Sequence, residues 1–156
     1  MSIATGTIAD RFIPRTAVNS VVLVFVGALV TALAAQIQIP MWPVPLTLQT
    51  FAVLLVGATL GAGRGAASLA TYLAMGAAGL PVFASAKTLT GVLPTAGFLV
   101  GFVFAAALVG FLASRGFTNT VIRVGFSFAF GSLVIYAFGV AGLMLTLGLT
   151  LSQAVA

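Results

Sequence analysis

One stretch of the chain combines proline, hydroxyl and amide side chains in a way that could hold a small molecule. In QIQIPMWPVPLTLQTF (36–51), three prolines prevent a continuous helix, and Thr47 and Gln49 follow them. Gln49 can both donate and accept hydrogen bonds. An amide inside an apolar segment costs free energy unless it is bonded. Gln49 therefore contacts either a ligand or a neighbouring helix, while Trp42 is typical of a membrane-interface anchor.

A second stretch, GLPVFASAKTLTGVLPTAGFLVGF (79–102), is loop-like and rich in small residues, but it is not polar enough for a plain solvated loop. It is typical of a lid or a cavity wall. Lys87 would complement a carboxylate there or remain an exposed loop charge. Hydroxyl donors are also present, at Thr88, Thr90 and Thr95. Tyr72, which precedes this stretch, is either a packing residue or a ligand contact.

The composition excludes most other chemistry. The chain has no cysteine or histidine, which removes the commonest metal ligands, and Asp10 is its one acidic residue. No pair of carboxylates can therefore divide acid and base roles, so we expect neither an enzyme nor a bound cofactor. The six basic residues stand singly rather than in a cluster or stripe, which excludes a nucleic-acid surface.

These residues must be positioned by membrane helices. Hydrophobic residues make up 62% of the chain and charged residues 4%, against about a quarter charged in soluble domains. Since about 20 apolar residues span a bilayer, the sequence predicts an all-α, compact transmembrane helical bundle in one domain, 1–156. The predicted spans are 18–37, 46–60, 66–80, 96–113 and 124–148, preceded by a cytoplasmic arm, 1–17.

The basic residues predict the orientation. With the N-terminus in the cytoplasm, the arm, the 61–65 turn and the 114–123 loop lie inside. Five of the six basic residues then fall inside, as the positive-inside rule expects, and only Lys87 lies outside. They are Arg11, Arg15, Arg64, Arg115 and Arg123. Five spans leave the C-terminus outside, so we expect a further span to be missing after Ala156.

Glycine and alanine patterns predict turns and close helix packing. The string GAGRGA (61–66) fits a dinucleotide-binding pattern, but it joins two apolar runs and no acid follows it, so we interpret it as a tight cytoplasmic hairpin. Small residues four apart allow helices to approach closely, within the bundle or against a partner subunit. The pairs are Ala28/Ala32, Gly57/Gly61, Gly97/Gly101 and Ala106/Gly110. The first pair is the best candidate for partner docking.

Three strings together resemble the BioY family, the biotin-binding components of energy-coupling-factor (ECF) vitamin importers. They are PVPLTLQTFAVLLVGATLG (43–61), GLPVFA (79–84) and PTAGFLVGF (94–102). The resemblance implies six helices in the bacterial cytoplasmic membrane, with biotin near the outer face beneath loops. It also implies a transmembrane coupling subunit and two ATPases as partners, with docking through Ala28 and Ala32. The five spans present are thus expected to be five of six, and the sixth would bring an acid and a lysine to the site.

The resemblance and the residues together give a hypothesis for the site. Phe83, Val82 and Phe98 would form apolar walls, Thr47 and Gln49 would bond the ligand, and Lys87 would neutralise the carboxylate of biotin. Tyr72 and Thr95 complete the expected site. Where relatives often have Gly-Pro-Thr-Gly-Gly, this chain has Ala96 in place of the first of the two final glycines, which predicts a stiffer loop. The alternatives are another vitamin of the thiamin or riboflavin class, and a non-transporting membrane subunit.

Overall fold

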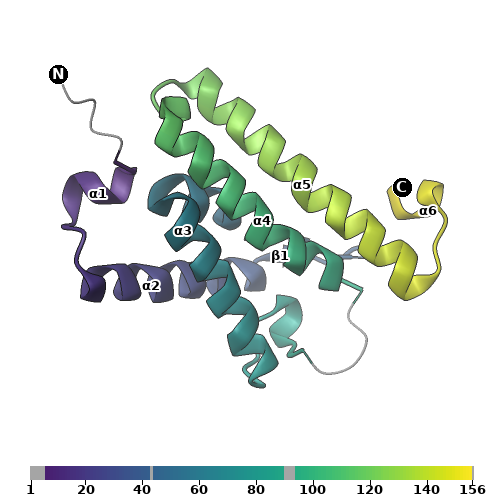
Figure 1. Ribbon diagram of the computed structural model, residues 1–156. Helices are drawn as coiled ribbons and strands as arrows, with labels where there is room; N and C mark the ends of the chain where they lie inside the picture. Colours follow the sequence, from purple (N-terminus) through teal and green to yellow (C-terminus); the bar gives the residue numbers. More distant parts are fainter. Residues whose placement is uncertain (1–5, 43, 90–93, 156) are drawn as a thin grey trace.

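A computed structural model describes residues 6–42, 44–89 and 94–155, and these residues form a bundle of helices (Figure 1). The all-α prediction is confirmed. The α-helices are α1 (Ile8–Phe12), α2 (Ala17–Gln36), α3 (Gln49–Ala77), α4 (Ala96–Leu112), α5 (Val121–Leu147) and α6 (Leu151–Val155). A 3₁₀ turn, η1 (Ala84–Ala86), precedes α4, and a π-helical turn, η2 (Ala113–Phe117), continues it.

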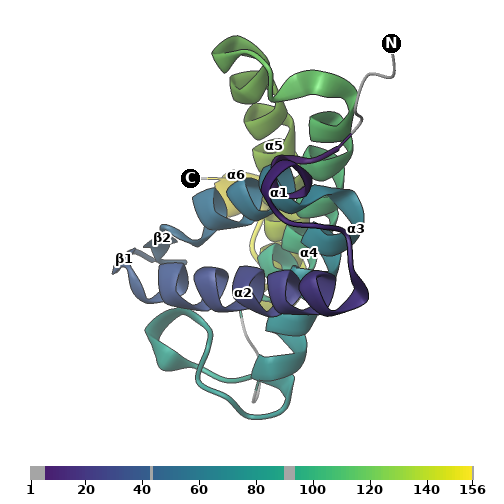
Figure 2. The same cartoon turned by 90° about the vertical axis from the view of Figure 1, so that its left-hand side faces the viewer.

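The proline-rich connection after α2 interrupts the helix, as the sequence predicts, and forms a hairpin that was not predicted. The N-cap Thr16 begins α2 by accepting a hydrogen bond from the Asn19 N–H (3.2 Å), and the helix ends before the prolines. Two short antiparallel strands follow, β1 (Gln38–Ile39) and β2 (Leu46–Thr47). Figure 2 shows this hairpin at the C-terminal end of α2. It delivers the chain directly to the first residue of α3.

The predicted second and third spans are joined in α3, which is kinked at Gly61 (φ 85°, ψ 175°). Only glycine adopts this conformation without strain. The kink reverses the chain: a Cβ at Gly65 would lie 3.0 Å from the Cα of Gly57, although eight residues of straight helix extend about 12 Å. The two arms of α3, residues 49–60 and 62–77, therefore form the expected hairpin, but without a separate turn segment.

Small residues allow the helices to pack closely, and α4 lies between α3 and α5 (Figure 1). Gly57 in α3 lies against the backbone of Ala106, and Gly110 lies against the backbone of the α3 hinge. Gly97 in α4 faces Gly142 in α5 in the same way. These contacts are within one chain, so at these positions the small residues serve intramolecular packing.

The outer faces of the long helices are apolar. Four helices of the described chain are long and apolar enough to cross a membrane: 17–36, 49–77, 96–117 and 121–147. Large side chains such as Phe25 and Leu33 on α2 and Phe126 and Phe130 on α5 are exposed. Such continuous apolar faces require lipid rather than water as their solvent.

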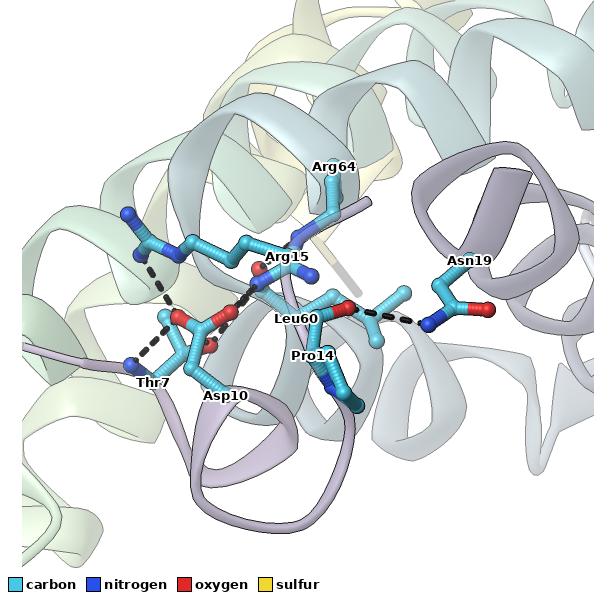
Figure 3. A network of polar contacts seen from close by, with 7 residues as sticks. All are labelled: Thr7, Asp10, Pro14, Arg15, Asn19, Leu60 and Arg64. Carbon is cyan, nitrogen blue, oxygen red and sulfur yellow. Dashed lines mark hydrogen bonds and ion pairs between the residues drawn. The ribbon is translucent and has the colours of Figure 1, made fainter. Parts of the chain in front are cut away.

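The arginine-bearing segments gather at one end of the bundle. Asp10 in α1 accepts hydrogen bonds from Arg15 (2.6 Å) and from Arg64, just after the α3 hinge (Figure 3). Arg15, Arg64 and Ser114 also line one small cavity of about 380 Å³. The arm, the hairpin and the 114–123 loop thus lie at the same end, which is the arrangement that the charge pattern predicts.

This ion-pair cluster orders the N-terminal arm. Arg15 lowers the pKa of the Asp10 carboxyl far below its ordinary value, partial burial opposes that shift, and Thr7 and Arg64 add to it. Thr7 completes a capping box with Asp10, so the same carboxylate holds α1 together and attaches it to α3.

Candidate functional site

A cavity of about 720 Å³ lies at the end of the bundle opposite the arginine cluster. Its walls come from the 41–47 connection, the start of α3, the 83–84 loop, the first turns of α4, the second half of α5, and α6. Small-molecule sites usually have volumes of about 300–1,000 Å³, mostly apolar walls and a few polar groups. The cavity fits this description.

Five of the predicted site residues line this cavity, and they come from four parts of the chain. Thr47 belongs to β2, Gln49 begins α3, Phe83 precedes η1, and Thr95 and Phe98 lie at the start of α4. The proline-rich connection and the 79–102 stretch therefore meet at one place, as the sequence analysis expects. The roles of these residues toward a ligand remain predictions.

Gln49 makes the helix contact that was considered for it and also lines the cavity, where a ligand contact stays a prediction. It is 4% exposed, it lines the cavity, and its Nε2 donates a hydrogen bond to the Tyr72 hydroxyl (2.9 Å) in the other arm of α3. Tyr72 in turn donates to the carbonyl oxygen of Val82 (3.1 Å). Tyr72 is fully buried and is not part of the cavity wall, which places it among the packing residues.

Phe83 connects this hydrogen-bonded group to the cavity. Its ring is 3% exposed and packs edge-on against the Tyr72 ring, with 5.3 Å between centroids. The ring also lies directly against Gly76, where a side chain would collide with it. Phe83 is thus held on two sides and faces the cavity on the third. The Val82 side chain is not part of the cavity wall, so the role expected for it as a wall is not supported.

Gln36 organises the loop after α3, a role that the sequence analysis missed. Its Nε2 donates to the Phe83 carbonyl oxygen (3.1 Å) and, more weakly, to that of Val82 (3.4 Å). Its Oε1 accepts from the Ala86 N–H (3.2 Å). The last side chain of α2 thereby fixes a loop about 50 residues further along the chain. The amide suggests a polar contact, but its partners are known only from the fold.

Lys87 is placed differently from the expectation. Its side chain is exposed and is not part of the cavity wall, while its carbonyl oxygen accepts a hydrogen bond from the Phe83 N–H (3.1 Å). None of the described wall residues carries a formal charge. Thr88 also lies outside the wall, and Thr90 lies outside the described residues.

The wall contributed by α5 was not predicted. Tyr136 lies on it, and its ring packs edge-on against that of Phe98 (6.3 Å between centroids). Leu133, Val140 and Met144 lie on the same wall, and Trp42, expected as an interface anchor, borders the cavity while remaining 79% exposed. A tyrosine in an apolar span is the one signal that could have indicated this wall.

Ala28 and Ala32 face the interior of the bundle. Ala28 is fully buried and Ala32 is 9% exposed, and both belong to the core that α2 forms with α3. While α3 covers these residues, a partner helix cannot reach them. In this structure the pair serves intramolecular packing, the alternative to docking that the sequence left open, and a docking role is untested.

The fold and the site together define a multi-pass helical membrane protein with a largely apolar, uncharged cavity. The sequence model of the BioY family matches residues 7–156. The chain therefore belongs to the BioY family.

Individual relatives agree with this assignment. The chain is 37% identical over 135 residues to the "Probable biotin transporter BioY" of Lysinibacillus sphaericus, covering 86% of this chain and 69% of the relative. It is 35% identical over 155 residues to the "Biotin transporter BioY" of Rhizobium etli, covering 94% and 80%.

A solved structure has the same fold. The chain matches the "S-component for biotin from an ECF-type ABC transporter" with a TM-score of 0.73 and 21% sequence identity. The match covers 92% of this chain and 80% of that one. At this identity the likeness concerns the fold.

Proposed function

We propose that this chain binds biotin in the 720 Å³ cavity and serves in its uptake as the substrate-binding subunit of an ECF-type importer. The observation that carries the proposal is the cavity: apolar walls enclose a small set of neutral hydrogen-bonding groups, in a member of a family whose relatives are named biotin transporters. Biotin combines an apolar fused ring and tail with a polar ureido head and a carboxylate. Such a ligand needs this mixture of surfaces.

Each part of the ligand has a proposed counterpart in the site. Phe83 and Phe98 pack against the apolar parts, and Thr47, Gln49 and Thr95 offer hydrogen bonds to the polar head. The carboxylate points to the cavity mouth, where Lys87 neutralises it from the exposed loop. Uptake then requires a transmembrane coupling subunit and ATPase subunits, which hydrolyse ATP.

The proposed orientation follows from the arginine cluster. The N-terminus and the α3 hinge lie on the cytoplasmic side of the bacterial membrane, because arginines concentrate there. The cavity, at the other end of the bundle, then opens toward the outside and receives the vitamin from that side.

Thermal unfolding of the purified protein with and without vitamins tests the binding. A ligand that binds only the folded state stabilises it by about 2.7 kcal/mol at 100 times its Kd. We expect biotin to raise the midpoint and thiamin or riboflavin to leave it unchanged. Stabilisation by one of those vitamins instead would assign another substrate, and stabilisation by none of the three would favour a non-transporting subunit.

Two variants test the assigned contacts. Gln49→Ala should weaken biotin binding, whereas Thr59→Ala should not, because the Thr59 hydroxyl bonds only its own helix, at the Leu55 and Val56 carbonyls. Lys87→Ala should weaken the binding of biotin but not of its neutral amide. Equal effects on both ligands would remove Lys87 from the site.

A further inference from the structure

Gln49 can present either of two chemically different faces to a ligand. A side-chain amide has an acceptor oxygen at one end and a donor NH₂ at the other, and rotating it by half a turn exchanges them. The face that points into the cavity determines whether the site selects a hydrogen-bond donor or an acceptor. The residues behind Gln49 determine which face this is.

The chain of contacts behind Gln49 begins at an atom that can only accept. The Val82 carbonyl oxygen receives the Tyr72 hydroxyl hydrogen across 3.1 Å. A hydroxyl has one hydrogen, so once Tyr72 donates to Val82 it can only accept from its other neighbour. That neighbour is Gln49, which must therefore turn its NH₂ group toward Tyr72, at 2.9 Å.

The alternative orientation of the amide is unfavourable. If Gln49 turned its oxygen toward Tyr72, the single hydroxyl hydrogen would face two acceptors, Gln49 Oε1 and the Val82 carbonyl. One acceptor would lose its bond to the hydroxyl, and Val82 would keep only the longer contact from Gln36 Nε2 (3.4 Å). A lost hydrogen bond of this kind costs about 0.5–1.5 kcal/mol.

The series of contacts behind Gln49 is also fixed at its far end, at Val82. The Val82 carbonyl lies in the loop that Gln36 holds through the neighbouring Phe83 carbonyl (3.1 Å), and the Tyr72 ring is packed against Phe83. Neither Val82 nor Tyr72 can turn away without breaking these contacts. The Val82 acceptor thus fixes the direction of the Tyr72 hydroxyl, and the hydroxyl in turn fixes the orientation of the Gln49 amide.

The oxygen of Gln49 is the group left for the cavity. Gln49 Oε1 has no hydrogen-bond partner among the described residues. It is also absent from the buried side-chain atoms of those residues that lack a partner, so it is exposed, and Gln49 lines the cavity. Oε1 is therefore an accessible acceptor on the cavity side.

We infer that Tyr72 is a positioning residue that sets the specificity of the site: it fixes the Gln49 amide so that Oε1 faces the cavity and selects a ligand N–H. With biotin as the ligand, which rests on the proposed function, the selected group is a ureido N–H. Tyr72 does this without touching the ligand.

Paired ligands test the inference. In each of two cyclic-carbamate analogues of biotin, one ureido N–H is replaced by oxygen, which removes one donor with little change in shape. The wild-type protein should bind one of these analogues about 5 to 150 times more weakly than biotin, the equivalent of one unsatisfied buried group. In Tyr72→Phe the amide is free to turn its NH₂ toward that oxygen, so the ratio should fall to about threefold or less.

A control variant separates positioning from stability. Ser68→Ala removes another buried hydroxyl from the same arm of α3, one that bonds the Arg64 carbonyl and does not line the cavity. It should lower the thermal midpoint but leave the analogue ratio unchanged. If Tyr72→Phe weakens biotin and both analogues by one common factor, the inference is wrong and Tyr72 is only structural.

A ligand-free measurement distinguishes this result from failure of the proposed function. The chain has four glutamines, so ¹⁵N-glutamine labelling gives four side-chain NH₂ signals, and the signal missing in Gln49→Ala identifies Gln49. In the wild type this NH₂ should exchange slowly with solvent, and in Tyr72→Phe it should exchange at least tenfold faster. Slow exchange in both proteins would overturn the inference even if biotin does not bind.

Discussion

Gly76→Ala should destabilise the protein when Phe83 is present and stabilise it when Phe83 is replaced by alanine. A Cβ on Gly76 would lie 2.8 Å from Phe83 Cε1 and closer still to two other ring atoms. The ring packs against Tyr72 on another side and lines the cavity, so a shift away from both neighbours takes it into the cavity. Gly76→Ala should therefore both strain the protein and fill part of the binding space.

The expected magnitudes come from two opposing effects. Overpacking a well-packed site costs about 1–3 kcal/mol. Gly76 lies within α3 in a helical conformation, and replacing a helical glycine by alanine by itself stabilises by about 0.5–1 kcal/mol. In the wild-type background the net change should be a destabilisation of up to about 2.5 kcal/mol.

Removing the Phe83 ring should change the effect of Gly76→Ala from destabilising to stabilising. Phe83→Ala alone should cost about 3–5 kcal/mol because it empties a buried site. In that background Gly76→Ala meets no ring, so only the helix effect remains and the protein gains about 0.5–1 kcal/mol. The two substitutions are thus coupled by about 1–3 kcal/mol.

A double-mutant cycle followed by thermal unfolding in detergent measures this coupling. For a chain of this size 1 kcal/mol shifts the midpoint by about 2–4 °C. Gly76→Ala should lower the midpoint in the wild type, raise it in Phe83→Ala, and weaken biotin binding only when the ring is present. Equal destabilisation in both backgrounds would refute the placement of the Phe83 ring.

Three further outcomes are expected. Asp10→Asn should destabilise the protein at neutral pH by about 1–3 kcal/mol, because it removes the negative charge between Arg15 and Arg64 and replaces one acceptor oxygen by a donor NH₂. Since the folded-state pKa of Asp10 is lowered from 3.8, wild-type stability from this group is full at neutral pH and falls below about pH 4, while the variant lacks that loss. Gly97→Leu should cost about 1–3 kcal/mol or more, because its Cβ would lie 2.7 Å from a facing Cα in α5, whereas Gly125→Leu, with open space around it, should be nearly neutral in thermal unfolding. Gln36→Leu should release the loop after α3, seen as faster hydrogen exchange at the Ala86 amide with little change in the long helices.

Much of the fold could be predicted because local features control it. Prolines such as Pro40 and Pro45 prevent α2 from continuing into α3, and glycine at 61 permits the reversal of α3. The arginines predict which segments share an end of the bundle, because the membrane sorts positive charge by side. These signals depend on backbone chemistry and on charge, so they need no knowledge of tertiary contacts.

The remaining features depend on contacts that sequence alone does not specify. The apolar residues of α5 look the same whether they face lipid or a cavity, so its wall of the site was not predicted. Ala28 and Ala32 indicate that something approaches α2 closely, but they do not indicate that the neighbour is α3 of the same chain. Gln36 reaches a loop about 50 residues away, which no spacing rule connects to it.

The two arms of α3 are levers that pivot close to the kink at Gly61. The arms touch at Gly57 and Gly65, near the kink, and at their far ends the Gln49 side chain bonds Tyr72. With about 12 Å from the contact to Gln49, a tilt of about 5° displaces the cavity end by about 1 Å. A bulkier residue at position 65 would therefore spread the two arms and strain the hydrogen bond between Gln49 and Tyr72 at their far ends.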